Sequence, residues 1–100
     1  MAYKVIWTET AQTDLHEIVE YIAKENLSAA RTIGSAIIEQ IEESTHFPFR
    51  NRKVPEVCKE EIREVVFPPY RIVYEVSKNQ RMIIVLRVWH SSRGQIDLDL

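Results

Sequence analysis

Cationic side chains stand inside or at the ends of three β-rich runs in the second half of this chain. The runs cover residues 62–67, 70–76 and 82–88. The cations are Arg63, Arg71, Arg87, His90 and Arg93. A cation within a strand needs a partner or water, so these residues predict a sheet with one face in use. A guanidinium can bind a phosphate or a carboxylate through two hydrogen bonds, and an imidazole can transfer protons.

Arg71 is separated from the apolar residues of its own run by simple alternation. One face of the run receives Tyr70, Ile72, Tyr74 and Val76, which suit a core covered by helices. Arg71 and Glu75 fall on the opposite, open face. Arg71 could bind a ligand there, or it could pair with Glu75 or with a residue of a neighbouring strand.

The elements that would position these residues follow from hydrophobic spacing. Residues 3–7 predict a first strand, and apolar residues with helical spacing then predict a helix that begins after Thr8 or Thr10. A second helix is expected over residues 29–44. Asn26 could end the first helix in a left-handed conformation, and Ser28 could cap the second. Gly34, near the buried stripe of the second helix, predicts a close approach to the first.

The fold class expected from this order is α+β with two layers, β-α-α-β-β-β. An antiparallel helical hairpin packs on a mainly antiparallel four-stranded sheet, in which three strands form a meander. Residues 1–94 form a single domain, and residues 95–100 form a tail. The tail alternates apolar and acidic residues and could be a further edge strand, or it could fray.

Composition narrows the class of protein. One hundred residues with ordinary hydrophobic content predict one globular domain, and the longest apolar run falls far short of the ~20 residues that span a bilayer. Cys58 is the single cysteine, and no Cys/His cluster has metal-ligand spacing. We therefore expect no metal, no cofactor and no membrane, and we expect a cytoplasmic protein without a secretory signal.

Charge is divided unevenly along the chain. Residues 1–49 hold three lysines and arginines against eight acids, whereas residues 50–94 hold ten against five. This division predicts that a polyanion or an acidic protein contacts the second half. Alternatively, the two halves neutralise each other in the fold.

Several segments together resemble one family of small proteins. They include Arg63-Glu64, the run 70–74, residues 88–90 and Arg93, preceded by Asp14-Leu15 in the first helix. In this order and spacing they resemble the RelE/ParE superfamily, the toxins of type II toxin–antitoxin pairs, over roughly residues 3–93. The resemblance is nearest to the ParE-like, or plasmid stabilisation, branch.

The resemblance implies two alternative activities. A ParE-like toxin inhibits DNA gyrase through protein contact, whereas a RelE-like toxin is a ribosome-dependent mRNA endoribonuclease. In the second case Arg71 would hold the scissile phosphate, and His90 and Glu56 would perform acid–base work. Strict alternation groups His90 with Met82, Ile84, Leu86 and Val88, so His90 and Arg71 need not share a face. A bulge or twist at the strand end could bring them together.

Three features favour the ParE-like alternative, while a ribonuclease and a degenerate, non-toxic member stay open. The loop from Arg52 to Glu56 and the Arg63-Glu64 opening look closer to ParE. The chain is slightly acidic, whereas a protein that enters the ribosome profits from a strongly positive surface. Lysines are also few around this loop, with only Lys53 and Lys59.

The resemblance also implies partners. A cognate antitoxin would wrap a segment across the helical hairpin and the sheet edge, and a homodimer is possible. The cations that could contact an antitoxin, gyrase or an mRNA backbone, or could simply be solvated, are Arg50, Arg52, Lys53, Arg63, Arg87 and Arg93.

Overall fold

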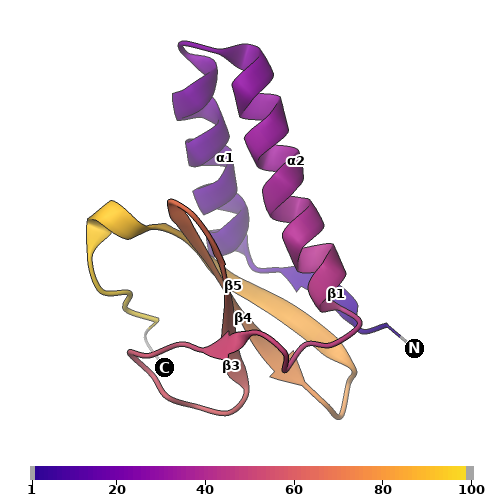
Figure 1. The fold of residues 1–100 in the computed structure, drawn as a ribbon. Helices are drawn as coiled ribbons and strands as arrows, with labels where there is room; N and C mark the ends of the chain where they lie inside the picture. Colours follow the sequence, from indigo (N-terminus) through magenta and orange to yellow (C-terminus); the bar gives the residue numbers. More distant parts are fainter. Residues whose placement is uncertain (1, 99–100) are drawn as a thin grey trace.

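The spacing of apolar residues changes from helical to alternating near residue 50, and the structure changes from helices to strands at the same place. The computed structural model describes residues 2–98 and has two layers (Figure 1). The helical layer contains α1 (Glu9–Ala23) and α2 (Leu27–Ser44). The sheet contains β1 (Lys4–Trp7), β2 (Arg52–Lys53), β3 (Ile62–Phe67), β4 (Tyr70–Ser77) and β5 (Met82–His90). The predicted α+β class is confirmed, with five strands rather than four because the short β2 pairs with β3.

The strand order is β1-β5-β4-β3-β2. The predicted meander of β3, β4 and β5 is antiparallel, and β1 lies parallel to β5 on its outer side. The parallel register pairs Lys4 with Met82 and Trp7 with Val85, so the first strand lies beside the last.

Side-chain caps set the start of both helices. Thr8 is the N-cap of α1, where its hydroxyl accepts the Ala11 N–H at 3.1 Å. Asn26 begins α2 instead of ending α1 in a left-handed conformation, because its φ is −152° and its side chain accepts the Ala29 N–H at 2.9 Å. Ser28 therefore lies inside α2, and the predicted start of this helix was two residues late. No helix within residues 2–98 is long and apolar enough to cross a bilayer.

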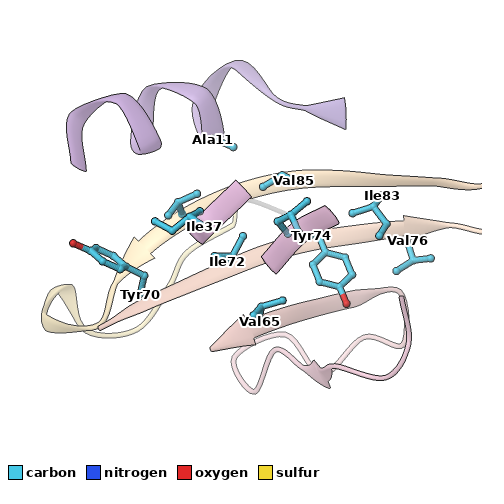
Figure 2. Close-up of a cluster of buried hydrophobic side chains, with 11 residues drawn as sticks. Ala11, Ile37, Val65, Tyr70, Ile72, Tyr74, Val76, Ile83 and Val85 are labelled. Carbon is cyan, nitrogen blue, oxygen red and sulfur yellow. The ribbon is translucent and has the colours of Figure 1, made fainter. Parts of the chain in front are cut away.

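The main core lies between the helices and one face of the sheet, as Figure 2 shows. The β4 residues predicted to face the helices are all buried: Tyr70, Ile72, Tyr74 and Val76. They pack with Ile37 of α2 and with Ile83 and Val85 of β5. Gly34 allows the two helices to approach, since a Cβ atom there would lie 3.1 Å from Cγ2 of Val19 in α1.

A second apolar cluster covers the sheet face that points away from the helices, which we call the far face. The far-face cluster consists of Val54, Ile62, Val73, Trp89 and Ile96. Leu98 packs against it from the tail. Residues 95–98 form no strand, and Ile96 is 5% exposed. The rest of the predicted tail, Asp99 and Leu100, lies outside the described residues.

Candidate functional site

Arg71 lies on the far face of β4, and two carboxylates surround its guanidinium group. Nη1 and Nη2 donate to Oε2 and Oε1 of Glu56, both at 2.7 Å, in a side-by-side pair. Nε donates to Oε1 of Glu64 at 2.7 Å. The Arg71 side chain is 12% exposed and the Glu64 side chain is fully buried. The edge of the guanidinium that would bind a phosphate is therefore occupied by Glu56.

These carboxylates connect five separate segments of the chain, including β4 through Arg71. Glu56 comes from the loop between β2 and β3, and its Oε2 also accepts the Ile96 N–H of the tail at 3.0 Å. Glu64 comes from β3, and its Oε2 accepts from Nε of Arg52 in β2 at 2.5 Å. We call Arg52, Glu56, Glu64 and Arg71 the ionic network. Because its members come from different strands and loops, it fixes the loop before β3 and the tail against the sheet.

Glu56 and Arg71 keep their charges over a wide pH range because each shifts the pKa of the other. The hydrogen bonds from Arg71 lower the pKa of Glu56 to about 2, against desolvation and with help from the Ile96 N–H. The hydrogen bonds to Glu56, together with those to Glu64, raise the pKa of Arg71 above its usual value. A carboxylate with so low a pKa is a weak general base near neutral pH.

His90 lies on the opposite face of the sheet from Arg71. The pairs Tyr70–His90 and Arg71–Trp89 place Trp89 beside Arg71, whereas His90 meets Tyr70 edge to face, with ring centroids 5.3 Å apart. The cause is a bulge in β5: Val73 pairs with Arg87 and Tyr74 with Val85, which leaves Leu86 without a partner in the register. Ile84 pairs with Glu75 and lies on the face of Arg71. Without the bulge, simple alternation from Ile84 would place His90 on that face too. The grouping of His90 with Met82 and Ile84 was therefore wrong, and the bulge separates the two residues instead of joining them.

The other predicted cations have different surroundings. Arg63 is buried and donates to the carbonyls of Phe49 and Asn51 and to Glu60, so it fixes the loop before β2. The ammonium of Lys53 lies 3.1 Å from the Glu60 carboxylate. Arg50 lies over the ring of Phe47 at 4.4 Å, and Arg93 lies over the ring of Trp89 at 4.1 Å. Arg50, Lys53 and Arg93 are the exposed members of this set that the ionic network does not use.

Asp14 and Glu64 are central to the structure, although neither was predicted to be a site residue. Asp14 is 7% exposed, and its carboxylate accepts from Nε and Nη2 of Arg87 at 2.7 and 2.9 Å. It also accepts the Val88 N–H, at 3.0 Å, beyond the point where β1 stops pairing with β5. Their positions in the sequence could have indicated burial. Asp14 falls four residues before Ile18 of the buried helix stripe, and Glu64 lies within a β-rich run.

Among the hollows along α1 in the described part of the chain, two differ clearly in chemical character. A cavity of about 200 Å³ at the end of β5 is lined by Asp14, Glu17, Ile18, Tyr21, Tyr70, Val88, His90 and Arg93. Desolvation raises the pKa of Tyr70 there. A larger, mainly apolar groove of about 550 Å³ is lined by Trp7, Gln12, Leu15, His16, Val19 and Ile38. The first hollow contains ionisable groups but not Arg71, and the second presents an apolar surface along the hairpin.

Comparisons with known proteins agree with this fold. The family model described as "ParE toxin of type II toxin-antitoxin system, parDE" matches residues 5–94. The chromosomal ParDE system of P. aeruginosa has a TM-score of 0.73 and 18% identity, covering 89% of this chain and 96% of that one. The RelBE2 toxin–antitoxin complex of Mycobacterium tuberculosis has a TM-score of 0.68 and 24% identity, covering 90% and 92%. A mutant of E. coli toxin RelE in the free state has a TM-score of 0.65 and 17% identity, covering 94% and 88%. A comparison with curated proteins found no match.

Proposed function

Because this chain belongs to the ParE toxin family and is a toxin of the RelE/ParE type, we propose that it inhibits DNA gyrase by protein contact. In this proposal the toxin performs no chemistry of its own. The observation that carries it is the state of Arg71, whose guanidinium is held by Glu56 and Glu64 at 2.7 Å. A residue committed to two carboxylates of its own chain supports a structural role for the far face.

The ribonuclease alternative has less support from this geometry. It requires Arg71 to hold a phosphate while His90 and Glu56 transfer protons on the same face. His90 lies across the sheet from Arg71, and Glu56 is its ion-pair partner. To bind RNA, the site would have to release Glu56 and also bring a proton donor around the sheet.

The surface proposed for target contact is the exposed corner formed by Phe47 and Arg50, with the exposed Lys53 three residues further along the chain. Phe47 is 59% exposed, and the guanidinium of Arg50 lies over its ring. Aromatic residues and arginine are the types most enriched at the energetic centres of protein interfaces. A contact of this kind matches an acidic or polar surface on gyrase and needs no reacting group.

We propose that a cognate antitoxin neutralises the toxin, as in the toxin–antitoxin complexes that share this fold. Its segment would occupy the apolar groove along the hairpin, where Leu15, Val19 and Ile38 are accessible. An amphipathic helix in such a groove presents one apolar face to it. Occupation of the groove would leave the corner at Phe47 accessible. Neutralisation of the toxin would then depend on how far the antitoxin extends around the hairpin.

The test is induction of the chain without antitoxin in a bacterial host, with plasmid supercoiling and mRNA 5′ ends measured in parallel. We expect loss of supercoiling, intact mRNA and full toxicity of His90→Asn. The double variant Phe47→Ala, Arg50→Ala should lose toxicity at least tenfold, whereas Arg31→Ala on the exposed side of α2 is the matched control. Ribosome-dependent cuts that disappear in His90→Asn would overturn the proposal in favour of the ribonuclease.

A further inference from the structure

The chain reverses direction after β5 and returns along the far face. A 3₁₀ turn, η1 (Ser91–Arg93), follows His90, and Gly94 at φ 81° completes the reversal with its N–H on the Ser91 carbonyl at 3.2 Å. In Figure 1 this segment, in yellow, runs back from the turn toward the loop that precedes β3. We call residues 94–98 the strap.

The strap closes the far-face cluster and is held by polar contacts at two points. The Trp89 indole N–H donates to the Gly94 carbonyl at 3.0 Å, and the Ile96 N–H donates to Glu56 at 3.0 Å. At the second of these points the Ile96 side chain is buried against the cluster. The path of the strap therefore depends on the turn that precedes it as well as on the ionic network.

His90 holds that turn through one ring nitrogen. Its Nδ1 accepts the Ser92 N–H at 3.1 Å and lies 2.7 Å from the Ser92 hydroxyl. The backbone N–H can donate only to a lone pair, so this contact requires Nδ1 without a proton. A protonated imidazole could still keep the hydroxyl contact, because the hydroxyl can change from donor to acceptor. The hydrogen bond from the Ser92 backbone N–H has no such alternative, so protonation of Nδ1 removes it.

Charged groups from two segments line the same cavity as His90. Asp14 and Glu17 come from α1, and Asp14 is paired with Arg87. Arg93 comes from the turn itself. The other residues that line the cavity are Ile18, Tyr21, Tyr70 and Val88.

We propose that protonation of His90 weakens the turn after β5 and loosens the strap from the far-face cluster. The mechanism is the exchange of an acceptor for a donor at Nδ1, which removes the cap of the turn. Glu56, at the other attachment point, stays charged between pH 8 and 5 because its pKa is about 2. The surface uncovered by a loosened strap includes Val54, Val73 and Trp89, so the exposure of an apolar patch would depend on pH. This inference is independent of whether gyrase is the target.

The test is backbone amide hydrogen exchange of the full chain by NMR at pH 8 and pH 5, corrected for intrinsic rates. We expect the protection of the Ile96 amide to fall roughly fivefold at pH 5, the ratio that loss of a typical side-chain cap gives. The amides of Ile72 and Tyr74 in the central strand should keep their protection. The Trp89 indole N–H, which contacts Gly94, should follow Ile96.

His90→Asn is the decisive variant, because the Asn side chain can accept the Ser92 N–H but does not titrate. It should keep Ile96 protected equally at both pH values. Glu56→Gln should lower the protection at both pH values and leave its pH ratio unchanged. The proposal is overturned if Ile96 protection in the native chain does not change with pH, if His90→Asn shows the same change, or if the central-strand amides fall with Ile96.

Discussion

The two faces of the sheet are stabilised by different means. Toward the helices, side chains from α1, α2 and three strands form a continuous apolar core around Ile72 and Tyr74 (Figure 2). On the far face, within residues 2–98, a smaller cluster packs against the loop before β3 and the strap, and the ionic network fixes both. The helix face thus depends mainly on area removed from water, whereas the far face depends on charges that must remain paired.

Among these changes, removal of the buried Glu64 carboxylate should lower the stability of the far face most. Glu64→Gln leaves the guanidinium of Arg71 without one of its charged partners in a buried position, so we expect the free energy of unfolding to fall by about 3 kcal/mol. Arg52→Gln, which changes the exposed end of the same network, should cost less than about 1 kcal/mol. Urea unfolding followed by circular dichroism measures both. Equal losses would mean that burial of Glu64 does not determine the stability of the far face.

Two fully buried valines on opposite faces allow a matched comparison of packing. Val85 lies under the helices. Val85→Ala should lower the free energy of unfolding by about 2–3 kcal/mol, because the surrounding core cannot collapse into the cavity. Val73 lies under the loop and the strap. Val73→Ala should lower the free energy of unfolding by about 1 kcal/mol, because these segments can move inward. The same unfolding measurement compares them, and a larger loss for Val73→Ala would reverse the assignment of the more rigid face.

Acid should weaken the far face first, with a smaller effect than Glu64→Gln or Val85→Ala. The pKa of Glu56 is lowered from 4.5 to about 2 in the folded chain, so its contribution is complete above pH 4.5 and is lost as pH falls toward 2. For a carboxylate at a loop surface we expect about 1 kcal/mol. Glu56→Gln should lack this part of the pH dependence in unfolding measured from pH 5 to pH 2. An unchanged slope in the variant would assign the acid effect to another group.

Local pattern was sufficient for the helix face. Alternation in β4 identified Tyr70, Ile72, Tyr74 and Val76 as core residues, and helical spacing correctly predicted that both helices pack against this core. These assignments depend on residues close in sequence and on one period per element, which a single chain displays directly. Gly34 was likewise correctly expected at the helix contact.

The far face could not be predicted in the same way, because its contacts join residues distant in sequence. Arg71 was assigned to the open face, but its partner Glu56 is 15 residues away in an irregular loop. The bulge at Leu86 has no distinct residue signature, and it decides on which face His90 lies. The short β2 was missed because two residues carry too little pattern to identify a strand.

The parallel pairing of β1 with β5 has a consequence for how the chain acquires its structure. The pairs Lys4–Met82 and Trp7–Val85 close a loop that contains most of the polypeptide. During synthesis the helical hairpin can form early, but the first strand has no place to dock until the last strand is complete. The order of assembly is therefore set by topology, and an incomplete nascent chain of this toxin has an unfinished sheet.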